Sequence, residues 1–212
     1  MRFVHIIRKF RTALQLILRQ GIPLRDYSIS GRRLRLYEGT LREKPDYDDA
    51  WFVALASRAN VIYDVGANIG QTAVLAMLAG AEQLVLIDPN PRALTLAAGN
   101  LINNGWIHRI RVFCVFIGDR DDDEVTFWTV GSGAARSIYP GHARTASRKG
   151  KTFKVPTMIL DTVYLRTELQ PDLVKIDVKG AETMVIAGAV NLVSNASPKI
   201  LVEMHHQPEL TM

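Results

Sequence analysis

The sequence predicts an α/β fold built on a doubly wound, mostly parallel β-sheet. From residue 61 onward, short apolar runs of strand length alternate with segments whose apolar residues recur at helical spacing. The runs are nearly continuous, which is typical of parallel strands buried on both faces. In the stretch 61–71, V-I-Y-D-V-G-A-N-I-G-Q, one run breaks into a glycine-containing loop before a helical segment begins. Open parallel sheets bind nucleotide-like cofactors at such strand-to-helix turns.

Length and charge restrict the class of protein. The chain has 212 residues, enough for one domain with a well-buried core. Its formal net charge of +5 comes from residues 1–20, which hold basic residues and no acidic one, whereas the remainder is balanced. Nucleic-acid binding by the globular part therefore gains no support from the charge. Cys114 is the only cysteine, which excludes a disulfide framework or a cysteine zinc cluster and suits a reducing cytoplasm.

Residues 1–59 are predicted to extend a single domain that covers residues 60–212. Within 1–20, apolar residues at helical spacing are interleaved with basic ones, which indicates an amphipathic helix. We expect this helix to pack on the domain or on a partner. The alternative is that it lies on an anionic membrane surface. No apolar run approaches the roughly 20 residues of a membrane span.

Glycine, proline and capping residues set the boundaries of the other elements. A small hairpin is expected over 28–41, with helices at 46–59, 71–79, 92–103 and 182–195 and strands at 61–64, 84–87, 110–116, 125–130, 153–160, 173–177 and 199–203. Asn90 is a natural N-cap, and Pro91 fits a first helical position. Trp51 and Phe52 are predicted to share one face of their helix. The polar stretch 131–151 is interpreted as a solvated connection, with a lid over a substrate as the alternative.

Acidic residues follow successive strands at the edge where such a sheet binds ligands. They are Asp64, Asp88, Asp119, Asp177 and Glu203. One acid at a strand end is a common helix cap, but five together predict a strongly negative crevice. Such a crevice suits a positively charged cofactor that carries hydroxyl and amino donors. We expect no metal site.

The glycine loop distinguishes two cofactor types. Dinucleotide sites usually carry G-x-G-x-x-G, whereas this loop reads G-A-N-I-G and lacks the middle glycine. S-adenosylmethionine has no phosphate, carries a sulfonium and an ammonium group, and offers ribose hydroxyls to a carboxylate. An acid-lined crevice with this loop therefore favours S-adenosylmethionine over a nicotinamide dinucleotide.

Several motifs, in this order and spacing, resemble one known family. They are D-V-G-A-N-I-G (64–70), the acid and P-x-P of 88–91, L-D (160–161), K-I-D-V-K-G-A-E (175–182) and L-V-E-M-H (201–205). Together they closely resemble the FkbM family of class I S-adenosylmethionine-dependent methyltransferases, over roughly residues 60–206. The resemblance implies a Rossmann-like methyltransferase sheet.

For the methionine part of the cofactor, the resemblance implies a role for the first loop. Asp64, with Gly66 and Gly70, would hold this part, and the Asp64 carboxylate would lie near the ammonium group. Asn68 in the same loop either shapes the turn or contacts the ligand.

For the nucleoside part, the resemblance implies two more acids. Asp88 would accept hydrogen bonds from the ribose hydroxyls, unless it only caps the turn before Pro89. Asp119 would reach the adenine amino group, although the neighbouring acids of 121–124 compete for that role.

Asp177 is the candidate beside the transferred methyl group. It would orient an acceptor hydroxyl or take its proton, unless it merely caps the next helix. Glu203 and His205 are two residues apart on the neighbouring strand, so their side chains share a face. His205 next to a carboxylate is a candidate proton acceptor, with His206 or a purely surface role as alternatives.

The chain departs from the family pattern in two places. The family usually has D-V-E-G-A-E where this chain has Lys179, and a cation beside Asp177 would lower the pKa of that aspartate and weaken it as a base. Lys179 also fits an acidic acceptor or lost activity. Class I methyltransferases typically add a helix and two strands after the strand that ends at Glu203. We expect these to be missing, which implies a fragment or an open sheet edge.

The sequence therefore predicts a cytoplasmic methyltransferase. In the membrane alternative, residues 1–20 would hold the protein at the membrane surface. The resemblance implies transfer of the methyl group to a hydroxyl of a sugar, a lipid-linked glycan or a secondary metabolite. A truncated or degenerate cofactor-binding module without turnover is the main alternative. A nicotinamide-dependent oxidoreductase is a weaker one.

Overall fold

The computed structural model describes residues 21–44, 46–129, 136–137 and 152–204, and it confirms the predicted α/β class. A five-stranded, fully parallel sheet forms the centre, in the order β11-β10-β3-β4-β5. The strands are β3 (Val61–Val65), β4 (Gln83–Ile87), β5 (Ile110–Phe113), β10 (Leu173–Ile176) and β11 (Lys199–Val202). The strand order reverses between β3 and β10, so the switch point where such sheets bind ligands lies there.

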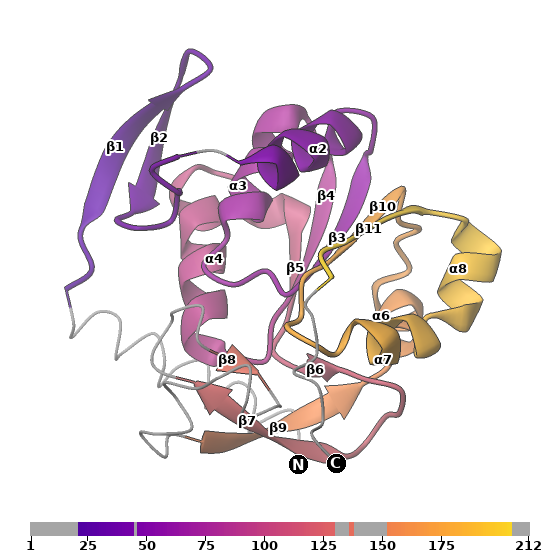
Figure 1. Ribbon diagram of the computed structural model, residues 1–212. Coiled ribbons are helices and arrows are strands. Elements are labelled where there is room, and N and C mark those ends of the chain that lie inside the picture. Colours follow the sequence, from indigo (N-terminus) through magenta and orange to yellow (C-terminus); the bar gives the residue numbers. More distant parts are fainter. Residues whose placement is uncertain (1–20, 45, 130–135, 138–151, 205–212) are drawn as a thin grey trace.

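Helices cover both faces of this sheet (Figure 1). One face carries α2 (Tyr47–Ala56), α3 (Gln71–Ala79) and α4 (Pro91–Asn103), followed by the short 3₁₀ turn η1 (Ile107–Arg109), and the other carries α6 (Leu160–Thr167), α7 (Glu182–Ala187) and α8 (Val190–Ala196). Asn90 caps α4 as predicted. None of the helices in the described ranges is long and apolar enough to cross a membrane.

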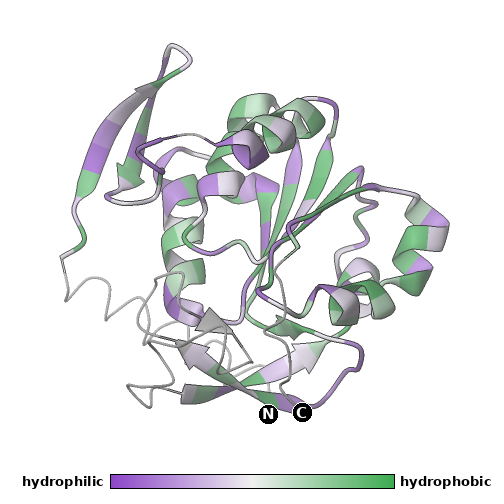
Figure 2. Ribbon diagram, viewed as in Figure 1, coloured by the Kyte–Doolittle hydropathy of each residue, from purple (hydrophilic) through white to green (hydrophobic). Residues whose placement is uncertain are grey.

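Alternate residues of the central strands fill two cores. In β3, Ile62 packs into the core beneath α2 to α4, whereas Tyr63 packs into the core beneath α6 and α8. Leu173 and Val174 of β10 divide in the same way. Figure 2 shows the resulting hydrophobic strands between the helical layers. Because both faces are buried, these strands read as continuous apolar runs in the sequence.

An N-terminal hairpin is fastened to α4 by two asparagines. It consists of β1 (Leu24–Ile29) and β2 (Arg32–Tyr37). Asn100 accepts from the Tyr37 N–H at 2.8 Å and donates to the Thr40 hydroxyl at 2.8 Å. Asn104, one turn later, pairs with both the N–H and the carbonyl of Arg35. These amides complete the hydrogen bonding of the β2 edge and attach the hairpin to the domain.

A second, smaller sheet lies below the first, in the order β6-β9-β7-β8 (Figure 1). Its strands are β6 (Phe116–Ile117), β7 (Glu124–Thr129), β8 (Arg136–Ser137) and β9 (Thr152–Met158). The single strand predicted over 110–116 is therefore wrong, because the chain leaves the large sheet after Phe113 and joins the small one at Phe116. Residues on both sides of this bend are apolar and buried or half-buried, so hydropathy alone did not reveal it.

The sequence also misjudged three helical features. The predicted strand 153–160 ends early because α6 begins at Leu160, and Asp121 accepts hydrogen bonds from the Ile159 N–H and the Thr162 hydroxyl at its start. The predicted helix 182–195 is two helices, broken at Gly188. Trp51 does not pack beside Phe52, since it is 65% exposed.

Some predicted features lie outside the described residues. They are the amphipathic helix of 1–20 and most of the connection 131–151. Their interpretations remain predictions.

We predict that Asn100→Ala lowers the free energy of unfolding by about 2–3 kcal/mol, because it leaves buried polar partners on the hairpin unsatisfied. Thermal unfolding should shift down by about 5–10 °C. Asn103→Ala, an exposed position on the same helix, should change stability by less than about 0.5 kcal/mol. Equal effects of the two substitutions would contradict this account of the hairpin.

We also predict that Tyr63 lowers the stability of the folded protein at alkaline pH. Burial raises the pKa of its phenol from 10.0 to about 12, although the hydrogen bond with Thr167 partly opposes this. The unfolded chain therefore releases this proton at lower pH than the folded chain. The free energy of unfolding falls as pH rises from the unfolded pKa of 10.0 towards the folded pKa of about 12. In urea unfolding, wild type should lose stability relative to Tyr63→Phe as pH rises above 10. Tyr47→Phe, at a position 85% exposed, should not alter this slope.

Candidate active site

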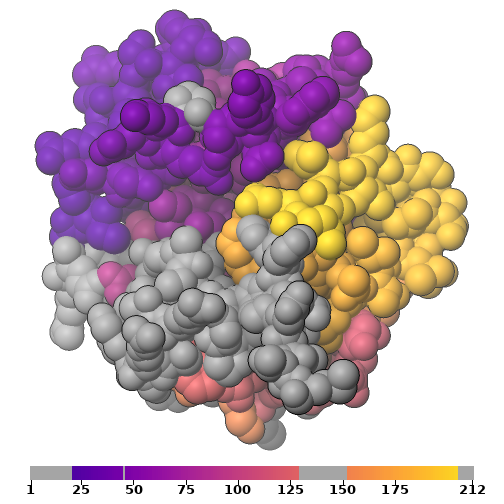
Figure 3. Space-filling view, viewed as in Figure 1, coloured from indigo at the N-terminus to yellow at the C-terminus, as the bar shows by residue number. Residues whose placement is uncertain are grey.

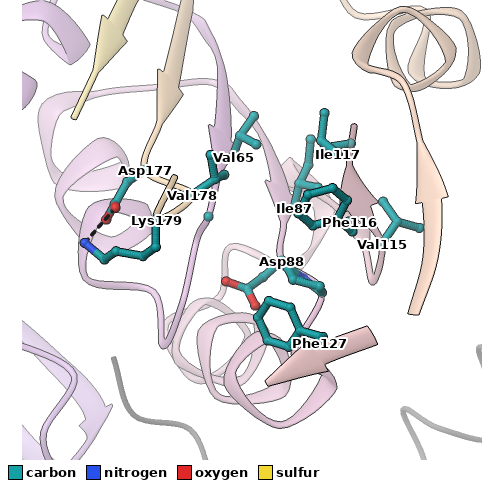
Figure 4. Close-up of a pocket in the computed structure, with 12 residues that line it drawn as sticks. Val65, Ile87, Asp88, Val115, Phe116, Ile117, Phe127, Asp177, Val178 and Lys179 are labelled. Carbon is teal, nitrogen blue, oxygen red and sulfur yellow. Dashed lines mark ion pairs between the residues drawn. The ribbon is translucent and has the colours of Figure 1, made fainter. Parts of the chain in front are cut away.

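A cavity opens at the carboxyl ends of the central strands, at the predicted switch point (Figure 4). The empty space among its lining residues is about 390 Å³, with the open solvent in its mouth included. It is lined by Val65, Gly66, Ile87, Asp88, Pro89, Val115, Phe116, Ile117, Phe127, Asp177, Val178 and Lys179. The cavity thus combines an apolar wall with two carboxylates and one ammonium group.

Three backbone amides in the loop between β3 and α3 are hydrogen-bonded within the protein. The N–H groups of Gly66 and Ala67 both donate to the Ile87 carbonyl, at 2.8 and 3.0 Å. The next amide, on Asn68, donates to the Asp88 carboxylate at 2.9 Å. A pyrophosphate site needs several such amides to point at the ligand. These three are already engaged, so this part of the loop does not cradle phosphate.

Glycine is required at two positions of this loop for packing. A Cβ atom on Gly66, whose φ is +88°, would lie 2.0 Å from the backbone oxygen of Asp177. A Cβ atom on Gly70 would lie 2.7 Å from the Cα atom of Ala97 in α4. The glycines therefore let the loop touch β10 on one side and α4 on the other. The structure gives them this packing role and does not test their predicted contact with ligand.

Asp88 lines the cavity and is buried. One carboxylate oxygen accepts from the Asn90 N–H at 2.8 Å and the other from the Asn68 N–H at 2.9 Å. Asp88 thus caps the turn, which was the alternative reading, and it also lines the cavity. Asn68 has a φ of +51°, and its buried Oδ1 has no hydrogen-bond partner among the described residues. Both loops therefore offer acceptors to a ligand with donor groups.

Asp64 does not line the cavity. It is fully buried on the opposite face of β3, where it accepts from the Thr72 hydroxyl at 2.6 Å and lies 3.5 Å from the Lys175 ammonium. Burial raises the pKa of the Asp64 carboxyl, and Lys175 and Thr72 partly oppose this shift. A ligand in the cavity therefore does not meet the Asp64 carboxylate directly, and the predicted contact of Asp64 with the cofactor stays a prediction.

Asp177 lies between two lysines. Its carboxylate is 2.9 Å from the Lys179 ammonium and 3.7 Å from that of Lys175 (Figure 4 marks the shorter pair). Lys179 is also 3.6 Å from Glu203. Sequence reasoning missed Lys175, although its spacing of two from Asp177 on a strand was a usable signal. The outcome is one charged network that runs from Asp64 to Glu203.

Asp119 is a predicted site residue that the structure does not bring to the cavity. Asp119 is exposed beside Arg120 and is not among the lining residues. His205 lies outside the described residues, as does His206. The wall is instead apolar, and Phe127 of β7 contributes a buried ring that packs edge-on against Phe153. No signal in the sequence distinguished Phe127 from an ordinary core residue.

The described part of the chain contains no group of three metal-ligating side chains.

A sequence model of the family described as the methyltransferase FkbM domain matches residues 64–211. The chain belongs to the FkbM methyltransferase-domain family. No curated protein sequence matches it significantly.

Solved structures resemble this FkbM-domain chain more loosely. An FkbM methyltransferase from Methylobacillus flagellatus KT is 17% identical with a TM-score of 0.49, and the match covers 68% of this chain and 32% of that one. An O-methyltransferase from Bacillus cereus in complex with SAH is 11% identical, with a TM-score of 0.38 and coverage of 81% and 55%. This chain thus spans about a third of the first protein and about half of the second.

Two motifs of the FkbM resemblance have structural roles here. Asp161 of the L-D pair accepts from the backbone amides of Asn191 and Leu192, and so caps the start of α8 from a neighbouring helix. Glu182, at the end of K-I-D-V-K-G-A-E, accepts from the Gly180 N–H in the turn before α7. Both side chains are buried. They fix the helices behind the strand end that carries Asp177.

We predict that Gly66→Ala destabilises the protein by more than about 4 kcal/mol or prevents folding, because a Cβ atom cannot share the space of the Asp177 backbone. Gly105→Ala is the matched control, since its φ of +80° is similar but no atom lies within 4 Å of the added carbon. The control should cost only about 1–2 kcal/mol for the left-handed backbone. Urea unfolding of both variants tests this, and similar losses would contradict the packing role.

Proposed function

We propose that this chain binds S-adenosylmethionine in the cavity and transfers its methyl group to a hydroxyl of a sugar, a lipid-linked glycan or a secondary metabolite. Family membership supports a methyltransferase, and the loop geometry supports the cofactor. The decisive observation is that the Gly66, Ala67 and Asn68 amides are all engaged within the protein. A phosphate-free cofactor fits such a loop, whereas a nicotinamide dinucleotide does not.

The lining of the cavity suits the parts of this cofactor. Asp88 offers acceptors to ribose hydroxyls, and the wall of Val115, Phe116 and Ile117 offers an apolar surface to a flat base. When bound, the cofactor supplies a methyl group on a positively charged sulfur, which leaves as a neutral thioether.

Asp177 is proposed to position the acceptor. Methylation of a hydroxyl forms an O–CH₃ bond while the S–CH₃ bond breaks, and the hydroxyl proton passes to the Asp177 carboxylate or to solvent. Asp177 is the carboxylate at the strand end, where it pairs with two lysines. A carboxylate accepts a hydrogen bond from a hydroxyl and so is suited to hold it in line with the methyl group. Positioning then supplies most of the catalysis.

A cofactor-binding module without turnover is the second candidate. It is favoured by the 2.9 Å ion pair between Lys179 and Asp177, because this lysine occupies the carboxylate that would receive the acceptor. The two candidates agree on cofactor binding and differ only in transfer. Experiments must therefore measure both.

We predict that calorimetry detects binding of S-adenosylmethionine and S-adenosylhomocysteine and none of NAD. Binding of NAD alone would refute the proposed cofactor. Radiolabelled methyl transfer into cell extract then separates the enzyme from the inactive module. Binding of both sulfur compounds without transfer would favour the module.

We further predict that Asp88→Asn and Asp177→Asn separate binding from transfer. Loss of the charged acceptor at Asp88 should weaken cofactor binding about 10- to 100-fold, equal to about 1.5–3 kcal/mol. Asp177→Asn should leave binding within about threefold of wild type and remove most transfer. Glu82→Gln, at an exposed position away from the cavity lining, is the control and should change neither. The reverse pattern would mean that the two aspartates have exchanged roles.

A further inference from the structure

A large apolar groove lies between the N-terminal hairpin and α2. Its empty space is about 1100 Å³ with open solvent included. The end of β1, the loop after β2, α2 and α3 line it, and their apolar side chains there are Ile29, Leu41, Ala50, Val53, Ala54 and Leu75. Figure 3 shows the hairpin, in indigo, and α2, in purple, on the same face of the molecule. Among the described residues, none lines both this groove and the active-site cavity.

Helix α2 is apolar on two sides. Phe52 and Ala56 are buried in the core, whereas Val53 and Ala54 lie in the groove. Val53 remains 36% exposed, and the exposed ring of Trp51 is three residues before Ala54, on the same side of the helix. A helix that is apolar all round is normally covered on every side. We therefore expect a further segment of protein to pack against this side of α2.

Hydrogen bonds hold the walls of the groove in place. Gln71, the first residue of α3, donates from Nε2 to the Asp49 carboxylate at 2.6 Å and accepts from the Arg42 N–H at 2.8 Å. The Arg42 guanidinium also pairs with Asp46 and Asp49. These contacts join α2, α3 and the loop after β2, so a segment that packs here meets a preformed surface.

Residues 1–20 suit this groove in pattern, length and position. They directly precede the hairpin, and their apolar residues recur at helical spacing. A helix over residues 3–18 would be about 24 Å long, and the six residues of β1 span about 20 Å. Gly21 has a φ of +58°, the left-handed conformation that commonly ends a helix, and Pro23 follows. A helix that ends there and runs back along β1 would reach Ile29, which lines the groove.

Charge favours the same occupant. Residues 42–49, at the rim of the groove, hold two basic and four acidic residues, and Asp46 and Asp49 of this stretch line the groove. Residues 1–20 carry five basic residues and no acidic one. Opposite charges therefore attract the segment to the rim, and the direct covalent link raises its effective concentration there. The same rim would repel an anionic membrane surface.

We propose that residues 1–20 form an amphipathic helix that packs in the groove of the same chain. Its apolar side lies against α2 and α3, and its basic residues lie towards the acidic rim. This docking covers the second apolar side of α2. The proposal is independent of the proposed function, because it assigns no ligand to the active-site cavity.

Hydrogen exchange on the full chain, measured by mass spectrometry, tests this docking. We expect the backbone amides of residues 3–18 to exchange about tenfold more slowly than those of the same sequence as a free peptide. Val53→Asp places a charge in the groove and should bring the rate to within about twofold of the peptide. Val193→Asp on α8 is the matched control, since Val193 is also 36% exposed but does not line the groove. It should leave the protection unchanged.

A pair of substitutions within the segment keeps the test decisive if Val53→Asp fails to fold. Phe10 lies on the apolar side of the predicted helix, and Thr12 lies on the opposite side. Phe10→Asp should remove the protection, whereas Thr12→Asp should retain it. Both substitutions change the net charge by the same amount, so a difference between them reports apolar packing.

Several results would overturn the proposal. Wild-type amides of residues 3–18 that exchange as fast as the free peptide would show that no docking occurs. Protection that appears only with vesicles of phosphatidylcholine and phosphatidylglycerol would assign the segment to a membrane. Protection that requires a dimer, identified by light scattering and lost on dilution, would assign it to a second copy. Protection that survives in folded Val53→Asp would place the segment elsewhere on the domain.

Discussion

The close contact between the first loop and the end of β10 holds this site together. Gly66 lies against the backbone of Asp177, and the Asp177 N–H donates to the Val65 carbonyl at 2.9 Å. The same loop reaches β4 through its amides. Three strand ends are thereby fixed relative to one another by backbone contacts, so the carboxylates of Asp88 and Asp177 are held at a set separation without any help from a ligand.

Packing of this kind explains what the sequence could and could not predict. The parallel strands, the loop glycines and the Asn90 cap follow from local patterns, because each depends on residues close in the chain. The bend after Phe113 and the break at Gly188 were missed, since both are decided by contacts with distant segments. Asp161, for example, caps α8 from about 30 residues away.

The sequence predicted Asp88 and Asp177 of the cavity lining and the Lys179 cation beside Asp177, but neither Lys175 nor the apolar wall. Asp88 and Asp177 were predicted because each follows a strand directly in the sequence. Strand ends alone do not show which face of the sheet a side chain takes. Asp64, predicted to lie near the ammonium group of the cofactor, is buried beside Lys175 and is not among the lining residues of the cavity. Phe127 lines the cavity only because the small sheet packs beneath the large one. This tertiary arrangement cannot be predicted from a local sequence pattern.

Lys179 has a consequence for how this chain relates to its family. The lysine sits between Asp177 and Glu203 and pairs with both. An acid at position 179, as the family usually has, would place three carboxylates together, because Glu203 belongs to the L-V-E-M-H motif that also resembles the family. The formal charges at positions 177, 179 and 203 therefore total −1 in this chain and −3 with an acid at position 179, so this strand end attracts a cationic ligand less strongly than the family pattern would.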